Sequence, residues 1–223
     1  MTTRKYTIAV LGGTGAEGGG LATRWAKAGH KVILGSRDSG RAAAVAAELN
    51  QALGIDTVKG DSNRNAAKAA EIVVLTVPHG AQRRTAEEAI DGIRGKILID
   101  ATVPLVPPKV ARVQLPADGS AVASLQKLLG EQARVVSAFQ NVSAHYLKDL
   151  DHTIDCDVLV CGDDVAAREV AIGLARDAGL RAYHAGPIAN SVAVEALTSV
   201  LISINSRYKV AGSGIRITGV PDQ

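Results

Sequence analysis

Short apolar runs alternate with longer amphipathic stretches along the first 139 residues. The apolar runs predict strands at 6–11, 31–34, 56–59, 72–77, 96–100 and 134–139. The stretches between them predict helices at 15–28, 41–53, 65–70, 81–90 and 120–129. Strands that alternate with helices in this way form parallel sheets with helices on both faces. Apolar strands rich in β-branched residues are typical of a sheet that is buried on both sides.

The alternation continues after residue 139 on a smaller scale. It predicts strands at 158–161 and 181–184, and helices at 145–150, 164–178 and 189–204. Ile215 and Ile217 alternate with polar residues and predict a short edge strand or a tail. No internal repeat or linker is evident. We therefore expect an α/β fold, with a Rossmann-type doubly wound parallel sheet in residues 1–139 and a small C-terminal α/β subdomain in residues 140–223 that completes the cleft.

The stretch 101–119 breaks this pattern. Pro104, Pro107, Pro108 and Pro116 lie within it, so it cannot form a regular helix. A long loop inside a compact domain is often functional. We expect this loop to border the ligand cleft.

A glycine-rich loop follows the first predicted strand directly. It contains Gly13-x-Gly15-x-x-Gly18 between a strand and a helix, the context that a dinucleotide-binding loop requires. The first glycine permits the tight turn, the second lets the backbone approach the pyrophosphate, and the third lets helix and strand pack closely. The phosphates then lie beside free N–H groups at the helix N-terminus. The residues expected to bind the dinucleotide here are Gly13, Thr14, Gly15, Ala16, Glu17 and Gly18.

The turn after the second strand indicates which dinucleotide binds. NAD sites usually have an acidic residue about 20 residues beyond the loop, but here the turn reads Gly35-Ser36-Arg37. A hydroxyl and a guanidinium suit a 2′-phosphate, because Arg donates a planar fork to phosphate oxygens. Arg41, one helical turn further on, could join Ser36 and Arg37. Asp38 is expected to start the next helix as its N-cap. These residues favour NADP over NAD.

Composition and charge narrow the choice of partners. Of the 223 residues 47% are hydrophobic and only 3% aromatic, so the core rests on aliphatic side chains and no stacking platform for nucleic acid is expected. The formal net charge of +3 is too balanced to indicate a nucleic-acid or membrane surface. Arg4 and Lys5 precede a strand too short for a signal sequence, and no apolar run approaches the roughly 20 residues that span a bilayer. We expect a soluble, cytoplasmic protein.

The two cysteines have no evident chemistry. The spacing of Cys156 and Cys161 fits no zinc signature and makes no disulfide framework. Five residues apart in one strand, the two thiols would point to opposite faces. We expect buried thiols in a reducing compartment, and no metal site.

Several blocks of this sequence resemble the NADPH:F-420 oxidoreductase family. They are Leu11-Gly-Gly-Thr-Gly-x-x-Gly18, Gly35-Ser36-Arg37, Leu75-Thr76-Val77-Pro78, Val160-Cys161-Gly162-Asp163-Asp164 and Ala185-Gly186-Pro187-x-x-Asn190-Ser191. The last two blocks are the more specific, because generic Rossmann proteins lack them. The resemblance implies an NADP-dependent oxidoreductase that transfers a hydride between NADP(H) and the deazaflavin coenzyme F-420. Members of the family often have His where this chain has Gln140, and an aromatic residue where it has His79.

Hydride transfer between two rings requires the protein mainly to hold the rings close together in the right orientation, because the cofactors themselves supply the reacting atoms. The cleft in such sheets lies beyond the carboxyl ends of the strands. The turns after the fourth, fifth and sixth strands should therefore converge on the nicotinamide. They contribute Thr76, Val77, Pro78, His79, Ala101, Thr102 and Ala138 as cofactor-binding residues. No catalytic residue is certain, and His79, Gln140 and Asn141 are the candidates in the cleft.

Weaker expectations concern the rest of the surface. His145, Tyr146 and His184 are less favoured cleft residues. Basic side chains that could meet the anionic tail of F-420 are Lys109, Arg112, Arg207, Lys209 and Arg216. The apolar face of the last helix, which includes Val200 and Ile204, is more often core but could pair two subunits of a homodimer.

Two rival functions remain open at this point. An NADP-dependent reductase of a small imine, ketone or metal would need a proton donor beside the nicotinamide, for which His79, His145 or Tyr146 could serve. Such enzymes usually add a large helical domain, which this length disfavours. A non-enzymatic NADP-sensing protein would keep the glycine loop and lose the open pocket that faces the nicotinamide.

Overall fold

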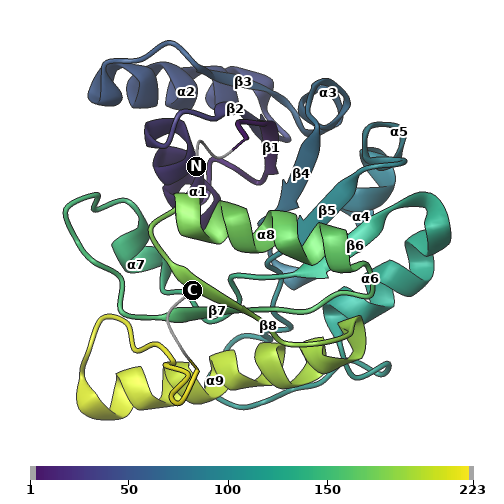
Figure 1. Ribbon diagram of the computed structural model, residues 1–223, viewed down its shortest axis with the longest axis vertical. Helices are drawn as coiled ribbons and strands as arrows, with labels where there is room; N and C mark the ends of the chain where they lie inside the picture. Colours follow the sequence, from purple (N-terminus) through teal and green to yellow (C-terminus); the bar gives the residue numbers. More distant parts are fainter. Residues whose placement is uncertain (1–3, 221–223) are drawn as a thin grey trace.

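A six-stranded parallel sheet forms the centre of the computed structural model, which describes residues 4–220 (Figure 1). The strand order is β3-β2-β1-β4-β5-β6. The strands are β1 (Thr7–Leu11), β2 (Lys31–Ser36), β3 (Val58–Ser62), β4 (Ile72–Leu75), β5 (Ile97–Asp100) and β6 (Arg134–Ser137). The order reverses between β1 and β4, which is where the loops at the carboxyl edge diverge to admit a ligand. The predicted Rossmann-type α/β fold is confirmed.

Helices cover both faces of this sheet, because successive side chains in each strand point to opposite sides. Ile8 and Val10 of β1 belong to one hydrophobic cluster, and Ala9 and Leu11 belong to the other. The first cluster is completed by α1 (Ala16–Lys27), α2 (Ser39–Leu53) and α8 (Val165–Asp177). The second is completed by α3 (Asn63–Ala69), α4 (His79–Glu88), α5 (Ile90–Ile93) and α6 (Ala121–Leu129).

The C-terminal part of the chain adds a small βαβ unit. Strands β7 (Asp157–Val160) and β8 (Arg181–His184) pair in parallel, and α8 connects them. An antiparallel bridge between Ser137 and Cys161 joins this unit to the end of β6. The remaining elements are α7 (Ala144–Leu147), α9 (Ser191–Tyr208) and the 3-10 helices η1 (Gly130–Gln132) and η2 (Ile188–Asn190). Because α8 shares a core cluster with β1, β4 and β5, the division at residue 139 stays a prediction.

Local sequence signals account for where α2, α3, α6 and α8 begin. Asp38 Oδ1 accepts a hydrogen bond from the Arg41 backbone N–H at 3.0 Å, so the predicted N-cap of α2 is confirmed. Ser62, Ser120 and Asp164 cap α3, α6 and α8 in the same way. The helix predicted at 81–90 begins earlier, at His79, and is broken at Ala89 into α4 and α5.

The proline-rich loop and the C-terminal tail have irregular structure. Residues 101–120 contain no helix or strand, which confirms the long proline-rich loop. Of the two alternatives predicted for Ile215 and Ile217, the structure has the tail and not the edge strand: residues 211–220 are irregular and lie beside β7, where Asp157 N donates to Ile215 O at 2.8 Å.

The last helix corrects the expectation about apolar length. The segment Ile188–Tyr208 is long and apolar enough to cross a membrane by length and composition. Its mean hydropathy is 1.4, and about one third of its most apolar 18-residue stretch is buried inside the protein. The expectation that no apolar run approaches spanning length is therefore wrong for this segment. Here α9 lies along the lower edge of the molecule in Figure 1, and its Glu195 is buried against the start of α6.

Candidate functional site

The predicted strand-end turns meet at the carboxyl edge of the sheet. The backbone ladder continues past the strands, since Leu11 O accepts from Thr76 N at 2.9 Å and Leu75 O accepts from Ala101 N at 3.0 Å. Asp100 O accepts from Ala138 N at 3.3 Å. The turns after β1, β4, β5 and β6 are therefore held side by side, as the sequence predicts.

The glycine loop is a tight backbone cradle. Gly12 N and Gly13 N both donate to Gly35 O, at 3.0 and 3.1 Å, which ties the loop to the end of β2. The left-handed residue of the turn is Gly12, with φ of +83°, and not Gly13 as the motif predicts. Gly13 is needed for a different reason, because a Cβ there would lie 2.7 Å from Val10 O.

Gly18 lets α1 approach the end of β4 closely. A Cβ at this position would lie 2.4 Å from Thr76 Oγ1 and 2.9 Å from Gly12 O, so no other residue fits without a shift. The helix begins at Ala16, and no side chain caps it. Its first N–H groups have no partner within the helix. An uncapped helix start above a glycine cradle is suited to a pyrophosphate.

The turn after β2 presents two cations at the same edge. Arg37 and Arg41 are exposed, and Ser36 is half-buried with its Oγ accepting from Asp38 N at 3.2 Å. Oδ1 of Asp38 accepts the capping hydrogen bond of α2, as the prediction of an N-cap requires. The charge available to a ligand at this turn is positive.

Exposure divides the predicted nicotinamide residues into two groups. Thr76, Val77 and His79 are half-buried and Pro78 is exposed. By contrast, Ala101, Thr102 and Ala138 are at most 3% exposed. The methyl group of Ala138 belongs to the core cluster. This residue therefore offers its backbone, and not its side chain, to the edge of the sheet.

The turn after β6 is anchored to α9. Asn141 Nδ2 donates to Val194 O at 2.9 Å and to Thr198 Oγ1 at 3.2 Å, while Thr198 Oγ1 donates to Gln140 O at 2.8 Å. Gln140 Nε2 donates to Asp100 O at 2.7 Å. The amide oxygens Gln140 Oε1 and Asn141 Oδ1 are buried without a partner. Unsatisfied acceptors are uncommon in native interiors, and both residues are nearly buried, at 4% and 5% exposed.

Two fully buried carboxyl groups support these turns. Asp100 is completely buried, and it accepts from Gln82 Nε2 at 2.5 Å and from Thr102 N at 2.9 Å. Glu195 is 1% exposed and accepts from Ser120 Oγ at 2.6 Å and from Ala121 N at 2.8 Å. Burial raises the pKa of both carboxyls above the ordinary range, partly offset by these hydrogen bonds.

A third carboxyl belongs to the glycine loop itself. Glu17 is the second residue of α1 and is half-buried. Burial, and then the negative charge of Asp100, raise the pKa of Glu17 to about 8. An acid in this position can therefore remain protonated near neutral pH.

The sequence analysis did not identify the residues that support the turns of the site through hydrogen bonds. They are Asn63, whose Oδ1 accepts weakly from Gly12 N at 3.4 Å, together with Gln82, Asp100, Glu195 and Thr198. A polar residue at the end of an apolar strand, as at Asp100, is the signal that could have identified one of them. The others lie on helix faces whose partners only the fold reveals.

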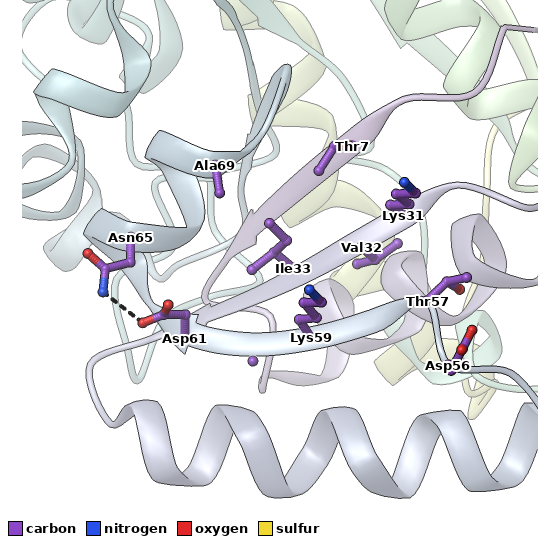
Figure 2. Close-up of a pocket in the computed structure, with 11 residues that line it drawn as sticks. Thr7, Lys31, Val32, Ile33, Asp56, Thr57, Lys59, Asp61, Asn65 and Ala69 are labelled. Atoms are coloured by element: carbon purple, nitrogen blue, oxygen red, sulfur yellow. Dashed lines mark hydrogen bonds between the residues drawn. The ribbon is translucent and has the colours of Figure 1, made fainter.

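A hollow lies away from the carboxyl edge, over the outer strands β2 and β3. It encloses about 470 Å³ and is lined by residues that include Lys31, Lys59, Asp61 and Asn65 (Figure 2). The short α3 leaves this face of the sheet open. Asn65 Nδ2 donates to Asp61 Oδ1 at 3.0 Å. None of the predicted cofactor-binding residues lines this hollow.

The weaker candidates His145, Tyr146 and His184 lie on α7 and at the end of β8. His184 Nε2 lies 2.8 Å from Glu169 Oε1 and its Nδ1 accepts from Arg168 Nε at 3.2 Å, so its ring is engaged on α8. His145 is exposed on α7, and the ring of Tyr146 stacks on His152 with 4.2 Å between centroids. The ring of His184 is therefore held by side chains of α8, and the ring of Tyr146 packs on His152.

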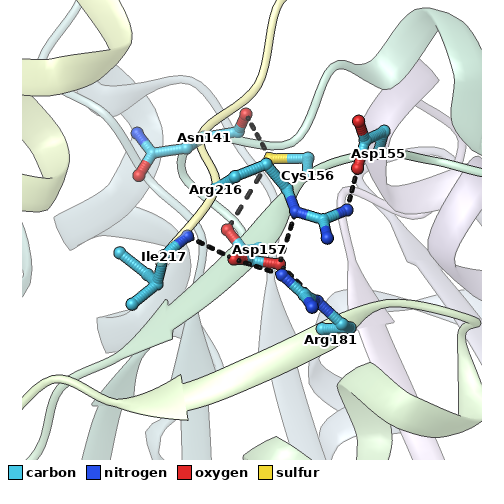
Figure 3. Close-up of polar contacts among 7 residues, drawn as sticks. All are labelled: Asn141, Asp155, Cys156, Asp157, Arg181, Arg216 and Ile217. Atoms are coloured by element: carbon cyan, nitrogen blue, oxygen red, sulfur yellow. Dashed lines mark hydrogen bonds and ion pairs between the residues drawn. The ribbon is translucent and has the colours of Figure 1, made fainter. Parts of the chain in front are cut away.

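Arg216, one of the candidates for a ligand's anionic tail, is paired with carboxylates of the protein. It forms an ion pair with Asp155, and its Nε lies 3.8 Å from Asp157 Oδ1 (Figure 3). Asp157, 1% exposed, also receives Arg181 Nε at 2.9 Å and Ile217 N at 2.6 Å. This cluster fastens the C-terminal tail across β7. Lys109, Arg112, Arg207 and Lys209 are exposed.

The cysteines are buried, as expected. Cys156 and Cys161 are 5% and 0% exposed. Burial raises the pKa of both thiols, to about 11 for Cys161, so neither forms a reactive thiolate near neutral pH. Within residues 4–220 no group of three or more His, Cys, Asp or Glu side chains is arranged to hold a metal ion.

Known proteins resemble this chain over nearly its whole length. Residues 7–104 match the family model described as NADP oxidoreductase, coenzyme F420-dependent. An F420-dependent NADP reductase of Methanocaldococcus jannaschii is 42% identical, covering 96% of this chain and 98% of its own length. One from Methanothermobacter thermautotrophicus is 43% identical, covering 97% and 96%.

Solved structures agree with this similarity. A protein from Arthrobacter sp. FB24, described as an F420-dependent NADP reductase, superposes with a TM-score of 0.78 at 28% identity and covers 95% of this chain and 98% of its own. An imine reductase from Myxococcus stipitatus superposes with a TM-score of 0.58 at 19% identity, and the match covers 92% of this chain but 62% of that one. The second likeness concerns the fold alone.

Proposed function

The chain belongs to the family of F420-dependent NADP oxidoreductases, and from this premise we propose how its own residues serve that activity. It is an NADP-dependent oxidoreductase that transfers a hydride between NADP(H) and coenzyme F-420. The observation that carries this conclusion is identity of 42–43% to F420-dependent NADP reductases over almost the full chain. The glycine cradle and the cationic turn at one edge of the sheet agree with it.

The residues proposed to hold the dinucleotide lie along the carboxyl edges of β1 and β2. The backbone of Gly13, Thr14, Gly15, Ala16, Glu17 and Gly18 would cradle the pyrophosphate. The support is the uncapped start of α1 and the space that Gly18 leaves beside Thr76. Ser36, Arg37 and Arg41 would bind the 2′-phosphate, since two exposed arginines follow a serine hydroxyl at this turn.

The residues proposed for the reacting end lie on the other side of the reversal in strand order. Thr76, Val77, Pro78, His79, Ala101, Thr102 and Ala138 would border the nicotinamide. Gln140 and Asn141 would border the deazaflavin, because they follow β6 at the carboxyl edge of the sheet, where ligands of such sheets bind.

The protein's contribution to such a transfer is geometric. When bound, the two coenzymes supply the hydride chemistry themselves. The turns after β4, β5 and β6 are held by backbone hydrogen bonds and by Asp100, so they would keep the two rings in a fixed orientation. Asn141 and Thr198 brace the deazaflavin side against α9.

A soluble homodimer in the cytoplasm is the proposed state of the protein. Val200, Ile204 and Tyr208 form an exposed stripe at i, i+4 and i+8 on α9, with 44%, 37% and 72% of each residue exposed. A second copy of this stripe could cover it about a two-fold axis. Glu195 and Thr198 hold the same helix against the domain, which favours a packed helix over a membrane span. No nucleic-acid partner is proposed.

An absorbance assay tests the activity directly. Purified protein mixed with NADPH and F-420 should bleach the deazaflavin absorbance, and NADH should do so far more slowly. The reverse reaction, from reduced F-420 and oxidised NADP, should restore it. Binding of NADPH without any bleaching would instead support the NADP-sensing function. Turnover of a small imine or ketone with no turnover of F-420 would support the other reductase class.

A further inference from the structure

One face of α9 contacts two segments of the candidate site that are far apart in sequence. Glu195 and Thr198 lie at i and i+3 on this helix, so their side chains lie on the same face. Glu195 Oε2 accepts from Ala121 N at 2.8 Å, at the start of α6, where the proline-rich loop ends. Thr198 Oγ1 donates to Gln140 O at 2.8 Å, in the turn after β6. The helix therefore connects the end of the proline-rich loop to that turn.

Buried hydrogen bonds close a circuit between these two contacts. Gln82 Nε2, on α4, donates to Ala121 O at 3.2 Å and to Asp100 Oδ2 at 2.5 Å. Asp100 O in turn accepts from Gln140 Nε2 at 2.7 Å. This hydrogen-bond circuit runs from α9 through α6, α4, the end of β5 and the turn after β6, and returns to α9. Gln82, Asp100 and Gln140 are all buried, so water competes little for these bonds.

The hydroxyl of Thr198 serves two consecutive residues of the turn after β6. Besides donating to Gln140 O, its Oγ1 accepts from Asn141 Nδ2 at 3.2 Å. The same amide nitrogen of Asn141 donates to Val194 O at 2.9 Å. A hydroxyl has one hydrogen to donate, and here it goes to a backbone carbonyl. The positions of Gln140 and Asn141 therefore depend on this one side chain.

The backbone of this turn needs support from both sides. Phe139 has φ of +76°, a conformation that residues other than glycine rarely adopt and that persists where the surroundings fix it. Trp25 contacts the ring of Phe139 on the core side. Thr198 holds the next residue, Gln140, on the α9 side. Loss of the Thr198 hydroxyl would leave the core contact in place and free the turn.

We propose that Thr198 is a positioning residue for hydride transfer, acting through Gln140 and Asn141 rather than on either coenzyme. The inference rests on the proposed function, which puts this turn beside the deazaflavin. Hydride transfer requires the two reacting carbons at about 3–3.5 Å and in alignment, so a displacement of about 1 Å slows it strongly. The part of Thr198 that matters is its hydroxyl, since the hydroxyl makes both contacts.

The dinucleotide cradle has supports of its own. Gly12 N and Gly13 N both donate to Gly35 O, which ties the glycine loop to β2. The bonds of the hydrogen-bond circuit do not include these glycines. A change at Thr198 should therefore lower the rate of hydride transfer and leave the affinity for NADPH unchanged.

Two substitutions separate the hydroxyl of Thr198 from its methyl group. Thr198→Val keeps the shape of the side chain and removes the hydroxyl, whereas Thr198→Ser keeps the hydroxyl and removes the methyl. Single turnovers of NADPH-saturated protein with saturating F-420 are followed by the deazaflavin absorbance. Thr198→Val should be slower by on the order of 10-fold, and Thr198→Ser should stay within about twofold of wild type. The Kd for NADPH, from fluorescence titration, should stay within about twofold in both variants.

Asn50→Ala controls for lost stability alone. Asn50, on α2, donates to Val58 O at 2.8 Å and accepts from Val58 N at 3.0 Å. The variant thus loses two hydrogen bonds, as Thr198→Val does, at the opposite edge of the sheet from β6. It should lower the midpoint of urea unfolding and leave the single-turnover rate unchanged.

The outcomes distinguish this inference from the proposed function. A single-turnover rate of Thr198→Val within about twofold of wild type overturns the positioning role. So does a rate for Thr198→Ser as low as that for Thr198→Val, or equal slowing in Asn50→Ala, because each would make the effect one of packing or stability. Failure of the wild type to reduce F-420 at all overturns the proposed function, and the role of Thr198 with it.

Discussion

The ring of Phe139 stands edge-on to the indole of Trp25, with 5.8 Å between ring centroids and 75° between the ring planes. Phe139 is 1% exposed and has φ of +76°, a left-handed backbone conformation that side chains rarely adopt. Trp25 Nε1 donates to Leu174 O of α8 at 2.8 Å. A core contact that involves α1 and α8 thus sets the direction in which the next residue, Gln140, enters the candidate site.

Phe139→Ala should remove this anchor. We expect the free energy of unfolding to fall by about 3–5 kcal/mol, because a fully buried ring leaves a cavity. Urea unfolding followed by circular dichroism measures it. Val165→Ala, which truncates a side chain that is 59% exposed on α8, serves as the control and should change stability little. A loss below about 1 kcal/mol in Phe139→Ala would contradict the anchoring role.

Gly18→Ala should disturb the cradle. The added Cβ would lie 2.4 Å from Thr76 Oγ1 and 2.9 Å from Gly12 O, so the loop must shift. We expect about 1–3 kcal/mol of lost stability, together with weaker NADPH binding in fluorescence titration. Gly80→Ala is the matched control, because nothing lies within 4 Å of its added Cβ. Equal behaviour of the two variants would argue against close packing at Gly18.

Arg37→Ala should discriminate between the two nicotinamide cofactors. Loss of a charge-assisted contact to the 2′-phosphate should weaken NADPH binding by about 1.5–3 kcal/mol, or roughly 10- to 150-fold in Kd. NADH binding should change little. Isothermal titration with both cofactors measures the two constants. Arg94→Ala, an exposed arginine paired with Asp91, controls for the loss of net charge. The same loss for both cofactors would remove Arg37 from the phosphate site.

Glu17→Gln should change how stability depends on pH, without any ligand. The native chain keeps the Glu17 proton up to about pH 8, whereas an unfolded chain loses it near the ordinary value of 4.5. Between these values the native state binds more protons, so this residue makes the free energy of unfolding fall as pH rises. The stability of the variant relative to wild type should therefore increase from about pH 5 to about pH 9 in chemical denaturation. An unchanged difference across that range would mean that the Glu17 pKa is not raised.

Val200→Glu should prevent subunit pairing through α9. The substitution puts a charge at the N-terminal end of the apolar stripe, where burial against a second copy would be costly. Sedimentation velocity should show a dimer for the wild type and a monomer for the variant. Val165→Glu, at a residue that is 59% exposed on α8, is the control and should remain dimeric. A monomeric wild type, or a Val200→Glu dimer of the same strength, would exclude this interface.

The local features of this protein were determined by its sequence alone. Apolar runs predicted β1, β2, β4 and β5, and the glycine-rich motif predicted the tight loop before α1. Asp38 was predicted as the N-cap of α2, and four prolines predicted the loop before α6. These features depend on residues near one another in the chain, through side-chain periodicity, turn chemistry and capping, so sequence reasoning reaches them. Nearly full-length similarity to known reductases then agreed with the family that the same blocks indicated.

Only the tertiary structure decided which distant groups meet. Asp100 joins Gln82 across 18 residues, and Glu195 reaches the start of α6 across 74. Arg216 looked available for a ligand, yet it is held by Asp155 and Asp157. Such pairings arise because helices and strands far apart in sequence pack together, and burial then makes each polar group find a partner or shift its pKa. No local pattern encodes that choice.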